Sequence, residues 1–305
     1  NTAVTKKKIK RCKEDVVFDA ACFIILTLVL FVVAYPLYWV IISSISAPSA
    51  VSSGKVLLHP IGFTLKGYAE VFKNDQVMRG FLNSLIITFC GVMVNLIVTL
   101  PTSYALSRSN FSGKKPITIF YLITMFFGGG LIPTYLVIQR LQMLNTIWAL
   151  ILPGCLSVYN MIVARTFFKS NISEELYEAA EIDGCTQARF FFQIALPLSK
   201  AIIAILVLYY GVGHWNSYFS ALVYISDKAK YPLQLVLRNI LITNQTALSQ
   251  TATTAAARAA LQEKQQLIDV MKYSLIIISS IPVLVMYPLV QKHFVKGVMI
   301  GSMKG

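Results

Sequence analysis

Carboxylates are scarce in this 305-residue sequence, which holds 13 Asp and Glu against 27 Lys and Arg. None occurs from residue 76 to residue 173, and none falls in the apolar runs 201–225 and 273–291. A proton-coupled carrier usually keeps an ionisable relay inside the membrane, because a buried charge is costly and is retained for that purpose. The absence of carboxylates from these segments therefore argues against a proton-coupled carrier. A sodium-coupled carrier can bind its ion through backbone carbonyls, so it stays open as an alternative.

Other chemical signatures are missing as well. No Gly-x4-Gly-Lys-Ser/Thr phosphate loop occurs, so we expect a chain that hydrolyses no nucleotide, is no enzyme and has no catalytic residue. The three histidines lie far apart, so no metal site is predicted, and His214 in its apolar run is more typical of hydrogen-bonded structure. The cysteines fall in predicted spans or on the cytoplasmic side, which implies no structural disulfide. They are Cys12, Cys22, Cys90, Cys155 and Cys185.

Apolar residues dominate what is present. Hydrophobic residues make up 56% of the chain, charged residues 13%, and the mean hydropathy is +0.66, values typical of a polytopic membrane protein. The length allows about six spans of roughly 20 residues. We predict an all-α protein with transmembrane helices at 20–44, 81–107, 117–137, 147–167, 201–225 and 273–291.

The connecting segments carry their own signals. Gly128-Gly129-Gly130 ahead of Pro133 predicts a broken or closely packed third span. The mixed segment 45–80 is expected to be an external loop with a short surface helix. Residues 242–269, rich in Ala, Thr and Gln, are expected to form either a polar surface helix or a mobile loop outside the membrane.

The net charge of +14 records membrane topology, because no basic patch interleaved with exposed aromatics indicates a nucleic-acid partner. Of the 27 basic residues, 16 fall in the segments predicted to be cytoplasmic, leaving 11 for the external loops. This bias predicts a basic cytoplasmic tail at 1–19, both termini inside, and contact with anionic lipid near the span ends. Residues 297–305 are then a cytoplasmic C-terminal tail.

A polar island at 171–200 interrupts the apolar pattern and holds five of the 13 carboxylates. Ser173 is expected to cap a first helix, Gly184 to stop it in the left-handed conformation, and Thr186 to cap a second helix. Pro197 is expected to end that second helix. An apolar face is predicted on the first helix from the spacing of Ile172, Leu176, Ala179 and Ala180.

This island resembles the coupling loop of bacterial ABC importer permeases, whose pattern is Glu-Ala-Ala, three residues, Gly, nine residues, Ile-x-Leu-Pro. Here that spacing is met without an insertion by Glu178-Ala179-Ala180, Gly184, Ile194 and Leu196-Pro197. Cys185-Thr186 stands where small residues such as Ala-Ser are usual in the family, and both replacements are small as well. The resemblance implies that loop 171–198 contacts an ATPase through Glu178, Ala179, Ala180, Asp183, Gly184, Ile194, Leu196 and Pro197.

Polar residues within the predicted spans are candidates for a translocation path. Aromatic faces with neighbouring amides suit sugars, which stack on rings and hydrogen-bond through their hydroxyls. Small and amide residues also join membrane helices regardless of transport, so both interpretations stay open. The candidates are Asn83, Asn95, Trp215, Asn216 and Tyr218.

The resemblance extends beyond the loop. Asn83-Ser84, Trp215-Asn216 and Tyr218-Phe219 are similar to carbohydrate-type permeases, and the run from Phe126 to Pro133 resembles a subgroup associated with complex oligosaccharides. The C-terminus resembles a maltose-permease-like tail that reaches into the ATPase dimer. This implies a second contact through Gly301, Ser302, Lys304 and Gly305.

Taken together, the resemblance implies a multi-pass permease domain at 20–296 in the bacterial cytoplasmic membrane. Its partners would be a second permease, two ABC ATPase subunits that bind ATP and Mg²⁺, an extracytoplasmic solute-binding protein, and a carbohydrate, here an oligosaccharide. No cofactor is expected in this chain. The alternatives are the sodium-coupled secondary carrier and a membrane-bound sensor or scaffold. Only the importer predicts a tightly bound, stoichiometric ATPase.

Overall fold

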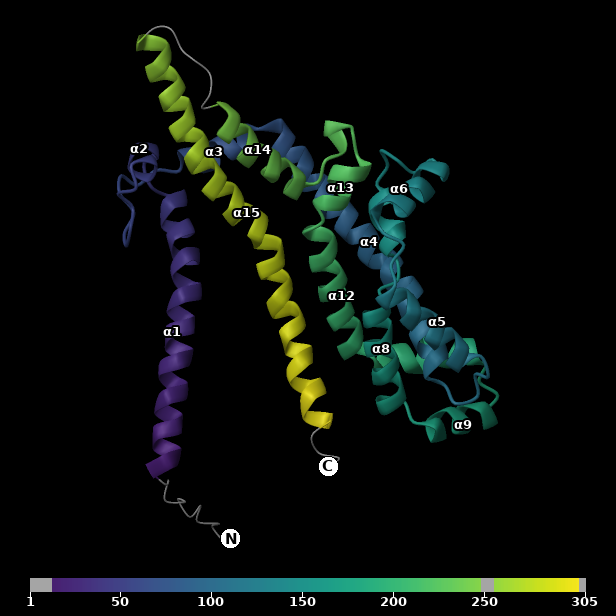
Figure 1. The fold of residues 1–305 in the computed structure, drawn as a ribbon. Helices are drawn as coiled ribbons and strands as arrows, with labels where there is room; N and C mark the ends of the chain where they lie inside the picture. Colours follow the sequence, from purple (N-terminus) through teal and green to yellow (C-terminus); the bar gives the residue numbers. More distant parts are fainter. Residues whose placement is uncertain (1–12, 248–254, 302–305) are drawn as a thin grey trace. The chain divides into compact units, whose positions relative to one another are not determined.

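The computed structural model describes residues 13–247 and 255–301, and every regular element in those residues is helical, as predicted (Figure 1). The longer helices are α1 (Lys13–Ser44), α4 (Asp75–Ser107), α5 (Lys114–Phe126), α8 (Val158–Asn171), α12 (Lys200–Trp215), α14 (Leu233–Ala247) and α15 (Ala255–Gly301). The shorter ones are α2 (Pro48–Ser52), α3 (Lys66–Lys73), α6 (Leu131–Arg140), α7 (Trp148–Ile151), α9 (Glu174–Ile182), α10 (Gln187–Phe190), α11 (Leu196–Leu198) and α13 (Phe219–Tyr224). Leu152–Gly154 and Lys228–Lys230 form 3-10 turns, and Phe191–Ala195 forms a π-helix.

Three described helical stretches are long and apolar enough to cross a membrane by themselves: Lys13–Ser44, Asp75–Ser107 and Gln265–Pro288. Three more apolar stretches are helix pairs bent at a short break, by 113°, 51° and 80°. The described residues therefore hold three straight candidates, or up to six if each bent pair counts as one span. The number of six spans stays a prediction.

The glycine run breaks the third predicted span as expected. Helix α5 ends at Phe126, α6 begins at Leu131, and the two axes meet at 113°. Gly130 has φ +85°, a conformation that side chains with a Cβ rarely adopt. Helix α6 can therefore leave in a new direction.

Two further spans were expected to be continuous, and both expectations are wrong. Span 147–167 breaks after Leu152–Gly154, and Ser157 starts α8 anew by accepting a hydrogen bond from the Asn160 backbone N–H at 3.4 Å. Span 201–225 also ends early, because α12 stops at Trp215 and α13 begins only at Phe219. Short polar and helix-breaking residues at these points favour caps and turns over a straight helix.

Helix boundaries at the two ends of the chain also differ from expectation. Helix α1 begins at Lys13, seven residues before the expected start of the first span at 20. The segment 242–269 is helical in both its described parts, in α14 up to Ala247 and in α15 from Ala255. Ala, Gln, Lys and Glu are strong helix formers, so α15 extends far beyond the predicted span 273–291 and runs for 47 residues.

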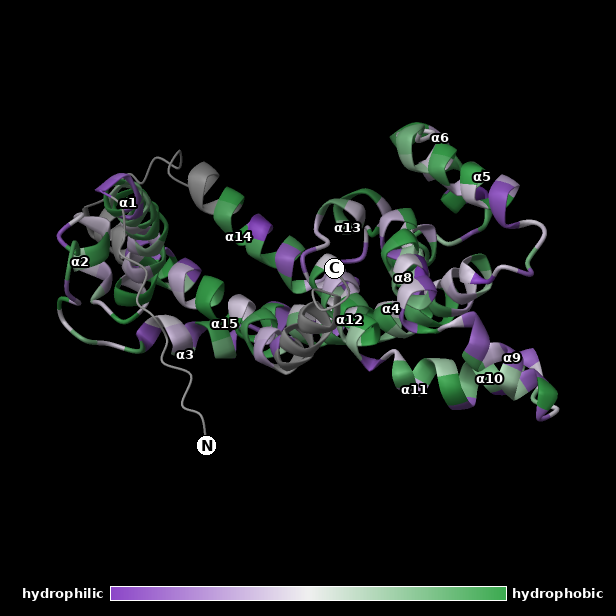
Figure 2. Cartoon of the chain, turned by 90° about the horizontal axis from the view of Figure 1, so that it is seen from below, coloured by the Kyte–Doolittle hydropathy of each residue, from purple (hydrophilic) through white to green (hydrophobic). Residues whose placement is uncertain are grey.

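The chain forms two compact units. The first comprises residues 1–69 and 252–277, and the second comprises residues 70–251 and 278–305. In the first unit, the C-terminal end of α1 is bound to the loop that follows α2. Trp39 donates its indole N–H to the Val56 carbonyl at 2.8 Å and packs edge-on against Tyr273 at 5.1 Å, while the Tyr38 hydroxyl donates to the Leu58 carbonyl at 2.6 Å. Residues 20–37 of α1 are almost all apolar and mostly exposed, as expected for a helix that faces lipid (Figure 2).

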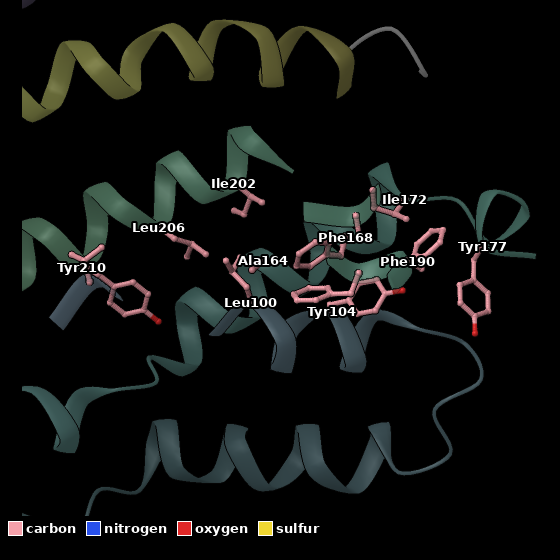
Figure 3. Close-up of a cluster of buried hydrophobic side chains, with 13 residues drawn as sticks. Leu100, Tyr104, Ala164, Phe168, Ile172, Tyr177, Phe190, Ile202, Leu206 and Tyr210 are labelled. Carbon is pink, nitrogen blue, oxygen red and sulfur yellow. The ribbon is translucent and has the colours of Figure 1, made fainter. Parts of the chain in front are cut away.

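The second unit is built on α4. The Asn74 side chain caps this helix by accepting hydrogen bonds from the backbone N–H groups of Gln76 and Val77. Helix α4 then packs against α8, α12 and α14. A cluster of buried hydrophobic residues, the aromatic cluster, joins α4, α8 and α12 to the helices of the polar island (Figure 3). It contains Leu100, Tyr104, Ala164, Phe168, Ile172, Tyr177, Phe190, Phe191, Ile202, Leu206 and Tyr210.

Candidate functional site

The polar island folds into a helix, a glycine turn and a second helical segment. The Ser173 hydroxyl accepts a hydrogen bond from the Leu176 backbone N–H at 3.3 Å, which caps α9 as predicted. Gly184 has φ +75° and donates its N–H to the Glu181 carbonyl at 2.9 Å. Cys185 donates to the Ala180 carbonyl at 2.9 Å. This pair of bonds is a Schellman motif, and it satisfies two carbonyls that the end of a helix leaves free.

The second helical segment begins as predicted and ends close to the predicted residue. Thr186 caps α10 by accepting a hydrogen bond from the Arg189 N–H at 3.3 Å. The chain then passes through the π-helix and α11, and the helical stretch ends at Leu198, one residue beyond Pro197. The 80° bend to α12 follows at Ser199, so the segment ends close to the proline, as predicted.

The face by which α9 packs is only partly the predicted one. Ile172 and Tyr177 are buried and Ala180 is partly buried, whereas Leu176 is 39% exposed and Ala179 is also exposed. Tyr177 decides this orientation, because its ring packs edge-on against Phe190 of α10 at 5.3 Å. Phe190 in turn lies in the aromatic cluster with Tyr104 and Phe168 (Figure 3). The aromatic contacts thus fix the loop to α4 and α8.

Comparison with known proteins shows which proteins this chain resembles. No family model matches the chain. It is 36% identical over 288 residues to the polygalacturonan/rhamnogalacturonan transport system permease protein YtcP of Bacillus subtilis, covering 94% of this chain and 98% of that protein. It is 38% identical to protein LplC of the same organism, covering 96% and 97%. This chain belongs to the family of sugar ABC importer permeases.

A solved structure agrees with this assignment. The permease matches a chain in the crystal structure of a bacterial ABC transporter involved in the import of the acidic polysaccharide alginate. The TM-score is 0.84 at 27% identity, and the match covers 94% of this chain and 100% of that one. These relatives favour the importer over the sodium-coupled carrier. The permease is an integral membrane protein, and loop 171–198 is the segment that matches the coupling-loop pattern.

The structure separates the predicted coupling residues into two groups. Glu178, Ala179, Asp183, Gly184 and Pro197 are exposed. The other three, Ala180, Ile194 and Leu196, pack against the aromatic cluster. The second group therefore supports the loop from inside. Ile182, which the motif does not specify, is the most exposed large hydrophobic residue of α9, at 88%.

The predicted second contact lies at the end of α15. Gly301 is the last residue of that helix in the permease. Ser302, Lys304 and Gly305 lie outside the described residues.

Three of the predicted path residues are hydrogen-bonded within the permease. Asn83 donates its amide to the carbonyls of Ala229 and Tyr231, at 2.8 and 3.1 Å. Asn95 is fully buried and donates to the Gly154 carbonyl at 2.8 Å. Trp215, which is 2% exposed, donates to the Ser279 carbonyl at 2.8 Å.

Asn95 also provides the hydrogen-bond partner of His214. The Asn95 side-chain oxygen lies 2.6 Å from Nε2 of His214, so the two side chains form one hydrogen-bonded pair. Because Gly154 stands where the fourth predicted span breaks, Asn95 satisfies a carbonyl that the break leaves without a helical partner. The sequence alone could not indicate this pairing, since the three residues lie far apart in the chain.

The other two path candidates face outward. Asn216 and Tyr218 are exposed, and Asn216 donates only to the Val212 carbonyl of its own helix. Tyr218 lines a shallow groove of about 280 Å³ together with side chains of α14. Those residues are Gln234, Leu237, Arg238 and Leu241.

Sequence reasoning missed the residues that join the coupling loop to α4. Tyr104, Arg108 and Tyr177 meet at this junction, and Arg108 forms an ion pair with Glu174. In the sequence, Arg108 is one of the basic residues after the second predicted span, where it indicates only topology. An arginine directly after a span and a carboxylate in the first turn of α9 were the available signals, but nothing in the sequence pairs them.

Proposed function

We propose that this permease forms half of the translocation path of an ATP-driven importer for carbohydrate, with an oligosaccharide as substrate. A second permease completes the path, two ATPase subunits bind ATP and Mg²⁺, and an extracytoplasmic solute-binding protein delivers the sugar. The names of the relatives support this substrate class, because they include transporters of polygalacturonan, rhamnogalacturonan and galacto-oligosaccharides. The permease itself holds no cofactor in this proposal.

The observation that carries the proposal is that α9 is capped at both ends and anchored on one face, while its other face is exposed. Ser173 caps one end, the Schellman motif closes the other, and Tyr177 anchors the buried face. The opposite face presents Leu176, Glu178 and Ile182 to the outside. A short rigid helix with exposed apolar residues beside carboxylates suits insertion into a cleft of a protein partner.

The proposed mechanism is alternating access. Closure of the ATPase dimer moves α9, and the aromatic cluster carries that movement to α4, α8 and α12 because closely packed interfaces transmit displacement. The Asn95 bond to Gly154 then extends the connection to the break between α7 and α8. Asn216 and Tyr218 are the path candidates left exposed for contact with the sugar.

The proposed orientation follows from the basic residues. Both termini and the coupling loop lie in the cytoplasm of a bacterium, and the permease lies in its cytoplasmic membrane. This orientation puts Glu178 and Gly184 where an ATPase can reach them, and it puts the segment 45–80 outside.

The test is substrate-stimulated ATP hydrolysis by the purified complex in proteoliposomes, with its solute-binding protein and a panel of glycans. We expect stoichiometric co-purification of an ABC ATPase, and stimulation by oligosaccharides rather than by amino acids or ions. A permease that purifies without an ATPase, and transports sugar down a sodium gradient, would refute the proposal.

A further inference from the structure

Arg108 is placed between the end of a span and the start of the coupling helix. It follows directly after α4, and its side chain is only 11% exposed. Its guanidinium donates to Oε2 of Glu174, the first residue of α9, at 2.5 Å. The Ser109 backbone N–H donates to Oε1 of the same carboxylate at 3.1 Å. Both oxygens of Glu174 are therefore bound by the two residues that follow α4.

Aromatic rings surround the same guanidinium. Its central carbon lies 4.4 Å from the ring centroid of Tyr177, 5.7 Å from that of Tyr104 and 6.0 Å from that of Phe190. These rings belong to α9, α4 and α10. A planar guanidinium can stack on rings while it binds a carboxylate, which a lysine ammonium cannot do in the same way. Cation–π attraction is also stronger where water is excluded.

The turn that carries Arg108 is itself held in place. Lys114, at the start of α5, donates its ammonium to the carbonyls of Arg108 and Ser109 at 3.3 and 3.1 Å. The first turn of α9 is thus fixed to α4, whereas Ile182 and Gly184 at its far end are exposed. Nine residues of helix span about 13 Å, so α9 runs from the ion pair at Glu174, past Tyr177 and Ala180 on its buried face, to an exposed end at Ile182.

Packing alone does not account for this arrangement. Aromatic contacts hold the helices together in preferred ring geometries, and the two bonds to the Glu174 carboxylate add a directional constraint at the first residue of α9. Directional bonds to a carboxylate fix both position and rotation. A partly buried ion pair is moreover weak evidence for stability by itself, and its best-supported use is to specify one arrangement.

We infer that Arg108 and Glu174 are positioning residues that make α4 move together with α9, so they set how much substrate crosses for each ATP hydrolysed. The inference rests on the proposed function, because it assigns the step between ATPase movement and the spans. Neither residue belongs to the coupling-loop motif, and neither needs to touch the ATPase or the sugar.

The experiment uses the complete importer in proteoliposomes and measures transport and ATP hydrolysis together. The variants are Glu174→Gln, Arg108→Lys, Arg108→Gln and the double variant Arg108→Gln/Glu174→Gln. The matched control is Asp269→Asn, which removes a partly buried ion pair of 2.9 Å with Lys272, on α15 rather than in the coupling loop.

We expect Glu174→Gln and Arg108→Gln to assemble with the ATPases and to lower substrate transported per ATP by about tenfold, within the range of roughly 5- to 150-fold that coupling between two sites spans. The double variant should lose no more than either single variant, because each change breaks the same connection. Arg108→Lys should lie between wild type and Arg108→Gln, and Asp269→Asn should match wild type.

The inference is overturned if the assembled variants keep the wild-type ratio of transport to hydrolysis, or if the losses in the double variant are additive. It is equally overturned if all variants, Arg108→Lys and Glu174→Gln included, fail to assemble, since the pair would then be purely structural. Wild-type protein that binds no ATPase would instead refute the proposed function, so the two failures are distinguishable.

Discussion

At the residue scale, two buried polar side chains, Asn95 and Tyr210, are hydrogen-bonded to the backbone where the helix breaks between α7 and α8. Asn95 satisfies the Gly154 carbonyl and pairs with His214, and Tyr210 acts similarly. The Tyr210 hydroxyl accepts from the Ser157 N–H at 3.2 Å and lies 2.7 Å from the Thr99 hydroxyl. An unsatisfied backbone group is costly in a membrane interior, where no water replaces the lost partner. These side chains therefore make a broken span tolerable.

A substitution at Asn95 tests this account. Asn95→Ala leaves the Gly154 carbonyl and His214 without their partner, so we expect a loss of about 1–3 kcal/mol in the free energy of unfolding, the usual cost of such groups. Thermal unfolding of the detergent-purified permease measures it. Asn216→Ala, at an exposed amide that bonds only within its own helix, should change stability by less than about 0.5 kcal/mol. Equal losses at both positions would contradict the role given to Asn95.

A second substitution, which adds a methyl group at Gly91, tests how tightly His214 is packed beside Asn95. A Cβ at this position would collide with the His214 ring, whereas nothing lies within 4 Å of a Cβ at Gly213. We expect Gly91→Ala to destabilise the permease by about 1–3 kcal/mol through overpacking and displacement of His214 from Asn95. Gly213→Ala should leave stability unchanged or raise it, since alanine favours a helix. The same thermal unfolding measurement applies, and a stable Gly91→Ala protein would show that His214 moves at little cost.

At the scale of the elements, local signals were readable from the sequence and tertiary ones were not. Ser173, Gly184 and Thr186 act through bonds to residues within five positions, so their residue types predicted the caps and the turn. The packed face of α9 was mispredicted because Tyr177 is buried against Phe190, which lies on the next helix.

The same distinction applies to the candidate path. Asn83 and Trp215 are residue types that serve both sugar binding and helix packing, and only their distant partners reveal the packing bonds they make. The glycine run of the third span was a local signal and was read correctly. The break at Ser157 and the long α15 depended on tertiary partners and helix propensity that the apolar pattern did not show.

At the coupling loop, substitution of Gly184 tests whether its left-handed turn is needed for transport. Its φ of +75° strains any residue with a Cβ, and Gly184→Val should cost roughly 1–2 kcal/mol in the turn. Nothing lies within 4 Å of a Cβ at this position, so the effect comes from the backbone alone. We expect Gly184→Val to insert in the membrane but to lose transport and substrate-stimulated hydrolysis. Gly184→Asn should retain most of both, because asparagine tolerates the left-handed conformation. Wild-type transport by Gly184→Val would show that the turn has no part in docking.

At the scale of the whole molecule, the orientation of the permease is open to a direct test. In a cysteine-free background, Ser170→Cys and Ser53→Cys are both at exposed positions, one before the coupling loop and one in the segment after α2. An impermeant thiol reagent applied to intact cells should label Ser53→Cys alone, and inverted vesicles should give the reverse. Labelling of Ser170→Cys from outside would contradict the proposed topology.

The central claim is that the exposed end of α9 docks on an ATPase, and site-specific photocrosslinking tests it most directly. A photoreactive amino acid replaces Ile182, which is 88% exposed at the free end of α9, and another replaces Tyr159, which is 56% exposed on α8, as the control. Irradiation of the purified complex should join position 182 to an identified ABC ATPase subunit, and position 159 should give no such product. Crosslinking from position 182 only to lipid or to the sister permease, in a complex that contains the ATPase, would contradict the claim.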